Sequence, residues 1–246
     1  MMTIGNRIRN EWRSLGLSFQ LQPTVILLSA CVLLTIYRYY GSSLFFDAHL
    51  ARLFHGAGLL PLYRTLYQFA ACFVCMLAVP AALSVFVLKK RLCDLGLTTG
   101  DTKAGLIIVA VVLPLAALLL LPTSHQPDFR AEYPLFHGAG RTLSLFVAYE
   151  LLYAVYYIGW EFFFRGFMLF GLAGSIGAAN AILVQTIPST LLHIGKPDGE
   201  IFAAIAAGIV FGIIALRTRS ILYVFVIHYL VGVTLDVFIV LSIRPG

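Results

Sequence analysis

Four ionisable side chains in the C-terminal half of the sequence are candidates for hydrolytic chemistry. Glu161 and Arg165 stand four residues apart in Gly-Trp-Glu-Phe-Phe-Phe-Arg-Gly (159–166), so a helix places carboxylate and guanidinium on one face, one turn apart. His193 ends a later apolar segment, and His228 lies inside the last one. An ionisable side chain in hydrocarbon costs about 2.5–3.5 kcal/mol on insertion scales, which favours a functional interpretation of the set.

One carboxylate and two imidazoles that meet in a cavity can do two things. They can hold a divalent metal as a set of two histidines and one carboxylate. Alternatively, Glu161 takes a proton from water while an imidazole stabilises the oxyanion or protonates the leaving amine. Both routes hydrolyse a substrate. The plain structural alternative is that the ion pair and the histidines only fix helix packing.

Three further polar residues belong to the same half of the chain. Tyr157 lies one turn before Glu161 on the same face and is expected to donate a hydrogen bond to it. Asp236, in the last apolar segment, is expected to support the site. Glu150 is eleven residues upstream of Glu161, about 16 Å along a helix axis, so the two cannot share one reacting atom.

The composition points to the membrane. Of 246 residues 60% are hydrophobic and only 11% charged, against roughly 45–50% and about 25% in soluble domains. The net charge of +6 comes from Lys and Arg scattered between apolar stretches, as in loops beside anionic lipid, so nucleic acid is not expected as a partner. The four cysteines show no disulfide framework, because three of them lie inside apolar runs.

The elements that must position these residues are therefore apolar helices, and the fold class is an all-α polytopic transmembrane bundle. We predict seven spans, with an eighth as an alternative, each near the length that crosses about 30 Å of hydrocarbon. Residues 143–172 are too long for one simple span, and Gly159 or Gly166 is a candidate break. Residues 42–58 are expected along the membrane surface. The predicted spans are 22–40, 66–88, 104–122, 143–172, 175–193, 201–216 and 220–242.

Basic loops predict the orientation. Arg7, Arg9 and Arg13 precede the first span, Lys89 to Lys103 follow the second, and Arg217 and Arg219 follow the sixth. Seven spans put these loops on one side, which we expect to be cytoplasmic together with the N-terminus, in a multi-pass protein of the plasma (inner) membrane. The expected organisation is an amphipathic N-terminus (1–21), N-terminal helices (22–141) and a catalytic core (142–242).

The core resembles the CPBP family of intramembrane proteases, also called the CAAX prenyl protease or Abi family, over about residues 145–238. The family signature is Glu-Glu-x-x-x-Arg, then Phe-x-x-x-His, then His-x-x-x-Asn, and Glu161, Arg165, His193 and His228 match it in order. The resemblance implies a glutamate-dependent, metal-independent endopeptidase without a cofactor, which cuts membrane-associated peptides. It implies that Glu161 is the general base, that His193 polarises the water and that His228 steadies the oxyanion.

Three positions depart from that signature. Trp160 stands where the family has its first glutamate, the residue usually credited with activating water. Ser189 replaces the phenylalanine before His193, and Gly232 replaces the asparagine after His228. Asp236 is one turn further, on a displaced face, and does not simply replace that asparagine. The departures leave two alternatives: a protease that works with one glutamate, or a catalytically inactive scaffold or binding protein.

Other functions fit the sequence less well. His193 and Asp198 have the His-x-x-x-x-Asp spacing of membrane acyltransferases, but that reading leaves Glu161, Arg165 and His228 unexplained. A transporter would typically show two similar halves, whereas the ionisable residues that lie inside apolar segments here concentrate in the second half. Rhomboid and zinc-protease motifs are absent from the sequence. The substrate's identity and the oligomeric state are not encoded in any readable pattern.

Overall fold

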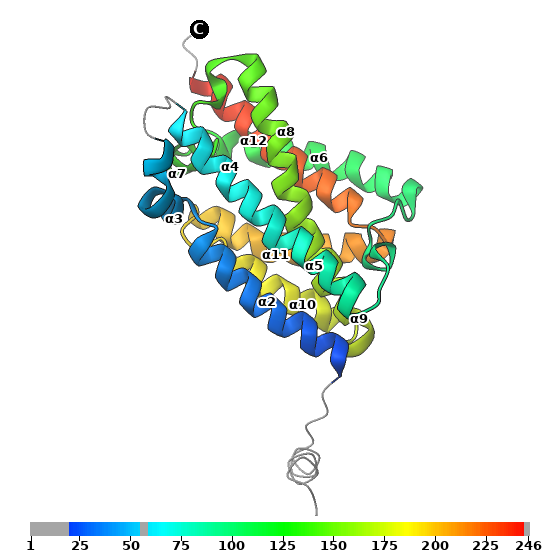
Figure 1. Cartoon of the computed structure of the whole chain (residues 1–246). Coiled ribbons are helices and arrows are strands. Elements are labelled where there is room, and N and C mark those ends of the chain that lie inside the picture. Colours follow the sequence, from blue (N-terminus) through cyan, green and yellow to red (C-terminus); the bar gives the residue numbers. More distant parts are fainter. Residues whose placement is uncertain (1–19, 55–58, 244–246) are drawn as a thin grey trace, which may run out of the picture.

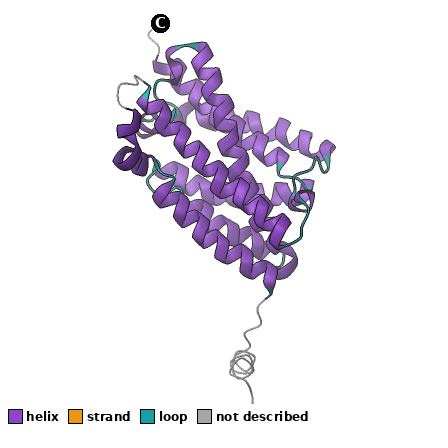
Figure 2. Ribbon diagram, viewed as in Figure 1, coloured by secondary structure: helices purple, strands orange, loops and turns teal. Residues whose placement is uncertain are grey.

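A computed structural model describes residues 20–54 and 59–243, and within these ranges the chain is helical and contains no strand (Figure 2). This confirms the all-α prediction. The α-helices are α2 (Leu21–Tyr40), α3 (Ser43–Phe45), α4 (Leu60–Cys72), α5 (Val79–Ala82), α6 (Thr102–Thr123), α7 (Pro127–Glu132), α8 (Leu143–Glu161), α9 (Gly171–Ile176), α10 (Ala178–Leu191), α11 (Asp198–Thr218) and α12 (Leu222–Ile243).

Six continuous helices in the described part of the chain are long and apolar enough to cross a membrane. They are Leu21–Tyr40, Leu60–Val87, Thr102–Thr123, Leu143–Ile176, Asp198–Thr218 and Leu222–Ser242. The predicted count of seven or eight is not confirmed. The difference is α10, which has 14 residues and a length of about 21 Å, short of the roughly 30 Å of hydrocarbon.

The long segment that begins at Leu143 is not broken at Gly159 or Gly166, contrary to expectation. It continues from α8 into η7 (Phe162–Phe170), a stretch of wider π-helical turns, and then into α9. Nearly every residue of η7 is buried, including the three consecutive phenylalanines that begin it. This burial on all sides comes from the helices that surround the stretch. Wider π-helical turns are frequent at functional sites.

The residues of η7 belong to the main hydrophobic core and pack against α9, α10 and α11, which Figure 1 shows near one another or behind the front helices. α10 packs against both η7 and α11, while α12 packs against α6 and α8. The packing brings the end of α8, the end of α10 and the first half of α12 into one region. The segments that carry Glu161, His193 and His228 therefore meet inside the bundle.

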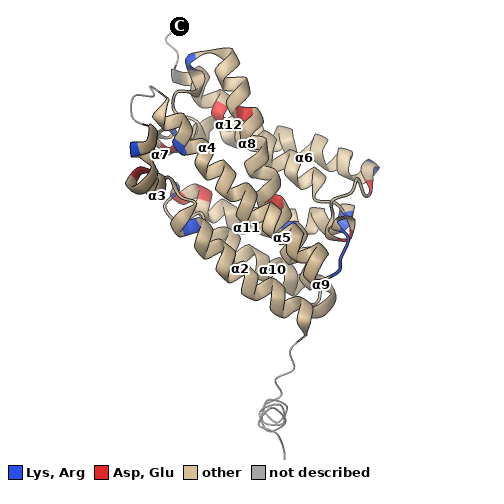
Figure 3. Cartoon of the chain, viewed as in Figure 1, with Lys and Arg blue, Asp and Glu red and all other residues tan. Residues whose placement is uncertain are grey.

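Two of the predicted basic loops lie together at one end of the bundle, where Figure 3 colours the ribbon of lysine and arginine residues blue. Arg217 Nη1 donates to Asp101 Oδ2 at 2.8 Å, and the Asp101 backbone N–H donates to the Thr218 carbonyl. α2 begins at the same end, since Gln22 Nε2 donates to the Gly171 carbonyl after η7. The arginines predicted to fix the N-terminal side fall within 1–19, outside the described residues.

The segment predicted to lie on the membrane surface forms three short helical pieces in its described part. These are α3, the π-helical η1 (Phe46–Leu50) and the 3-10 helix η2 (Ala51–Phe54); residues 55–58 lie outside the described residues. Ser42 begins the segment, and its side-chain oxygen accepts from the Phe45 N–H and caps the first turn. The position of this segment relative to a membrane stays a prediction.

Candidate active site

Glu161, the last residue of α8, lies between two cationic or protonatable partners. Its Oε1 accepts from Arg165 Nη1 at 3.2 Å within the same helix and from His228 Nδ1 at 2.6 Å on α12. The carboxylate is completely buried. The sequence predicted that the glutamate and an imidazole lie close together. His228 lies within hydrogen-bond distance of Glu161.

Arg165 is as deeply buried as the glutamate, which makes the pair a charge-neutral unit inside the core. Its guanidinium also lies over the ring of Phe211 on α11, 5.3 Å from the centroid, and 6.0 Å from that of Phe164. Ring faces attract a cation, so these contacts offset part of the cost of removing it from water. The pair fixes the end of α8 against α11 and α12.

His193 occupies the loop that follows α10, at the level of Trp160, whose ring it meets edge-on at 5.4 Å. His193 Nδ1 lies 2.7 Å from the Ser189 carbonyl oxygen. A carbonyl only accepts, so the proton sits on Nδ1 and the Nε2 lone pair is free. Burial lowers the pKa of His193 to about 4, so the ring is neutral at physiological pH.

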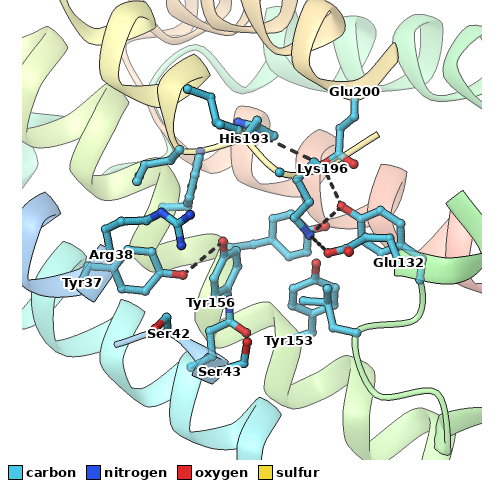
Figure 4. Close-up of a pocket in the computed structure, with 18 of the residues that line it drawn as sticks. Tyr37, Arg38, Ser42, Ser43, Glu132, Tyr153, Tyr156, His193, Lys196 and Glu200 are labelled. Carbon is cyan, nitrogen blue, oxygen red and sulfur yellow. Dashed lines mark hydrogen bonds and ion pairs between the residues drawn. The ribbon is translucent and has the colours of Figure 1, made fainter. Parts of the chain in front are cut away.

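A cavity of about 360 Å³ adjoins these histidines (Figure 4). It is lined mainly by polar and aromatic side chains from the end of α2, from α4, from α8 and from the loops before α8 and α11. Among them are Tyr37, Arg38, Glu132, Tyr153, Tyr156, Trp160, Lys196 and Glu200. This cavity can hold water and the polar part of a ligand.

A second cavity, of about 390 Å³, lies between α6, α11 and α12 and is lined chiefly by apolar side chains, among them Leu119, Phe211 and Val231. It shares five lining residues with the polar cavity: Tyr133, Tyr157, His193, Glu200 and His228. Both histidines thus stand at the junction of a polar space and an apolar one. A ligand with an apolar segment beside a polar backbone fits this arrangement.

Glu161, the predicted general base, lines neither cavity. The acid at the junction is instead Glu200, in the first turn of α11, and Glu200 Oε1 lies 3.9 Å from His193 Nε2. Glu200 is not among the site residues that the sequence predicted. The available signal was its position seven residues after His193, at the start of an apolar helix, where an acidic residue is ordinary because it complements the helix dipole.

A hydrogen-bonded chain that was also missed holds Glu200 in place (Figure 4). Tyr133 donates its hydroxyl hydrogen to Glu200 Oε1 at 2.7 Å and accepts from Lys196 Nζ at 3.2 Å. Lys196 also forms an ion pair with Glu132 at the end of α7. The loop before α8 and the loop before α11 are joined in this way across the cavity.

Tyr157 does not make the predicted hydrogen bond. The hydrogen bonds found among the described residues include none from Tyr157 to Glu161, and the Tyr157 ring lies edge-on to His228 at 4.7 Å. Helical side chains lean toward the preceding turn, which carries this ring away from residue 161. A Cβ added at Gly232 would lie 2.1 Å from the Tyr157 hydroxyl oxygen, so Tyr157 occupies the space of a side chain at 232.

Asp236 lies away from this junction. It is buried, accepts a hydrogen bond from the Tyr149 hydroxyl at 3.3 Å and lines neither cavity. Glu150, which the sequence placed too far from Glu161 to share its chemistry, is near enough to Asp236 to interact with it electrostatically. The two acids form a separate buried cluster, and the supporting role of Asp236 stays a prediction.

The other candidate arrangements do not assemble in the same way. Within residues 20–54 and 59–243, no three His, Cys, Asp or Glu side chains are grouped to share a metal ion. Asp198, the acid of the acyltransferase spacing, is exposed, whereas the ion-pair partner that His193 faces is Glu200. The His193–Asp198 interpretation therefore has no geometric support.

Comparison with known families agrees with the motifs. Residues 140–234 match the family model described as type II CAAX prenyl endopeptidase, Rce1-like, which confirms the resemblance drawn from the sequence. Neither the search of curated proteins nor the search of solved structures finds a match. The match and the six apolar helices identify an integral membrane protein.

Proposed function

We propose that this membrane protein, whose residues 140–234 match the Rce1-like family of CAAX prenyl endopeptidases, is an intramembrane endopeptidase that hydrolyses membrane-associated peptides with an activated water. The observation that carries the proposal is the position of His193 and His228, which both line the junction of a polar and an apolar cavity. The apolar cavity accommodates a lipid-like or apolar segment of the substrate. The polar cavity supplies water to the bond beside it.

Each histidine has one ring nitrogen committed to the protein and one left for chemistry. His193 donates from Nδ1 to a backbone carbonyl, so Nε2 can accept from a water molecule. His228 donates from Nδ1 to Glu161. When His228 carries protons on both nitrogens, Nε2–H can donate to an oxyanion, and the Glu161 carboxylate offsets the charge. Glu161 is then a positioning residue, acting through His228.

Tyr157 is a second donor in this proposal. Its hydroxyl lies against Gly232, in the space that a longer side chain at 232 would fill, and the residue lines both cavities. An oxyanion near His228 would therefore be within reach of a phenolic O–H as well as an imidazole. Donors aimed at a developing charge in a site shielded from water are worth several kcal/mol to a transition state.

The test is cleavage by the purified full-length chain in liposomes. The probes are fluorescence-quenched peptides with an apolar C-terminal segment, one set S-farnesylated and one unmodified. We expect cleavage by the wild type, and loss of at least about 100-fold in His193→Ala and His228→Ala. The matched control is His125→Ala, an exposed histidine after α6, which should retain activity. Cleavage that persists in both active-site variants would exclude the proposal.

A catalytically inactive binding protein is the second candidate, favoured by Trp160, whose indole lines the polar cavity where the family has a glutamate. The same peptides distinguish the two. Binding without cleavage by the wild type, measured by fluorescence anisotropy, supports the inactive protein. Cleavage that survives strong chelators supports the metal-independent protease that the resemblance implies.

A further inference from the structure

Glu200 is the only carboxylate among the described residues that lines both cavities. Glu132 lines the polar cavity alone and is occupied by its ion pair with Lys196, and Glu161 lines neither. A group that takes a proton from water must reach that water, directly or through one intervening molecule. By position, Glu200 meets this requirement and Glu161 does not.

The carboxylate of Glu200 is held in one orientation. Its Oε1 accepts from the Tyr133 hydroxyl at 2.7 Å, and Lys196 donates to that hydroxyl in turn. Its Oε2 is buried and has no hydrogen-bond partner among the described residues. Buried carboxylate oxygens are normally paired, because leaving one unpaired costs about 1–3 kcal/mol or more. Oε1 keeps a second lone pair beside the one that Tyr133 uses, so it can accept from a molecule in the cavity, whereas Oε2 is shielded.

His193 presents a second acceptor beside Glu200. Nε2 carries the lone pair, since Nδ1 donates to the Ser189 carbonyl, and it lies 3.9 Å from Glu200 Oε1. That separation is too long for a hydrogen bond but suits two atoms that bond to one water molecule at roughly 2.8 Å each. A water that donates one hydrogen to each acceptor has both lone pairs free for attack.

We infer that Glu200 is the catalytic residue that takes the proton from the attacking water, with His193 Nε2 orienting that water. The inference deepens the proposed function and rests on it. The water oxygen bonds to the carbonyl carbon, the carbonyl π pair moves to oxygen, and one water proton passes to Glu200. On collapse the carbonyl reforms, the C–N bond breaks, and Glu200 returns the proton to the leaving amine. The sum is peptide plus water giving carboxylic acid plus amine.

With Glu200 as the base, the reaction does not require a glutamate at position 160, where this chain has Trp160. Trp160 on α8 and Glu200 on α11 both line the polar cavity, and each is a neighbour of the His193 ring. A carboxylate can therefore reach the same imidazole from α11 when residue 160 is an indole. The purely structural alternative is that Glu200 stabilises the start of α11, a role that Asp198 in the same turn can fill equally well.

The experiment compares Glu200→Gln, Glu200→Asp and Asp198→Asn with the wild type, as full-length chains in liposomes with the quenched peptides. Glu200→Gln keeps the shape and removes the base, so we expect kcat to fall by about 100-fold or more while KM stays within about threefold. The residual activity should also lose the part of the acid limb that Glu200 contributes and keep the part near pH 4 that comes from His193. Asp198→Asn removes the same charge from the same turn and should behave as the wild type.

Glu200→Asp retains a carboxylate on a shorter side chain and guards against misfolding of the Gln variant. It should lower kcat and keep the acid limb. Wild-type kcat in Glu200→Gln, or an equal loss in Asp198→Asn, overturns the assignment of Glu200 and leaves the protease proposal standing. A wild type that cleaves none of the peptides contradicts the proposed function, and the assignment falls with it.

Discussion

The carboxylate of Glu161 accepts a hydrogen bond from the imidazole of His228, a residue 67 positions later in the sequence. The two side chains come from α8 and α12, and Oε1 to Nδ1 is 2.6 Å. Because Arg165 contacts the same oxygen, one buried oxygen joins a guanidinium to an imidazole. The contact leaves Nε2 as the only ring nitrogen of His228 available to a substrate.

Removing the charge of Glu161 should destabilise the protein through Arg165. Glu161→Gln keeps the volume but leaves a buried guanidinium without its counter-ion, which we expect to cost about 3–5 kcal/mol. Thermal unfolding in detergent measures the change. The double variant Glu161→Gln/Arg165→Met removes the uncompensated charge and should be more stable than Glu161→Gln alone. Equal stability of the two would show that the pair carries no such coupling.

Acid should weaken the fold through His193. Burial lowers its pKa to about 4, against an ordinary value near 6.5, so the unfolded chain binds a proton in a range where the folded chain does not. Its contribution is complete above about pH 6.5 and is lost as the pH falls toward 4, by at most about 3 kcal/mol. Unfolding midpoints at pH 7 and 4.5 test this. His193→Gln should show a smaller difference between the two pH values, and an unchanged difference would contradict the prediction.

A side chain at 232 should be incompatible with Tyr157. The Cβ of Gly232→Ala would lie 2.1 Å from the Tyr157 hydroxyl oxygen, which forces a shift in the packed interior. We expect a loss of about 1–3 kcal/mol in the free energy of unfolding. Gly174→Ala is the control, because a Cβ there meets nothing within 4 Å. Adding Tyr157→Leu to Gly232→Ala should recover stability, and strictly additive losses would argue against the clash.

Tyr133 should matter to the rate through Glu200. Tyr133→Phe deletes the donor that orients Glu200 Oε1, and the net value of one such hydrogen bond predicts a fall of roughly tenfold in kcat. KM should change little, because the aromatic ring remains. The measurement is the initial rate over a range of concentrations of the quenched peptides. A change confined to KM would assign Tyr133 to substrate binding instead.

The helical architecture could be predicted from sequence because hydrophobic runs and their charged borders mark where helices cross a bilayer. Six of the seven predicted segments correspond to the long helices, within a few residues for most ends. The sequence did not predict that α10 is too short to span the membrane, because hydropathy does not say how deeply a short apolar helix lies in the bundle. The unbroken helical stretch Phe162–Phe170 was not predicted either, because burial on all sides depends on the neighbouring helices.

The candidate site could be predicted only in part. A charged residue inside an apolar run is conspicuous, and this identified Glu161, His193 and His228. Glu200 stands at the first turn of a helix, where an acid is unremarkable in sequence, and only the packing of α10 against α11 brings it beside His193. Whether a carboxylate faces a cavity depends on helix rotation, which the spacing of residues along one helix does not fix.

The two ends of α11 carry residues of opposite charge, and their placement bears on the side of the membrane at which a substrate reaches the site. Glu200 lies in its first turn and Arg217 in its last, about 25 Å apart along the axis. If the basic end lies on the cytoplasmic side, as the loops predict, we expect the proposed hydrolysis near the outer leaflet. After replacement of the four cysteines, a membrane-impermeant thiol reagent added to intact cells should label Asp198→Cys and spare Lys103→Cys; the reverse labelling inverts the topology. An inhibitor of this reaction would then need no passage across the bilayer.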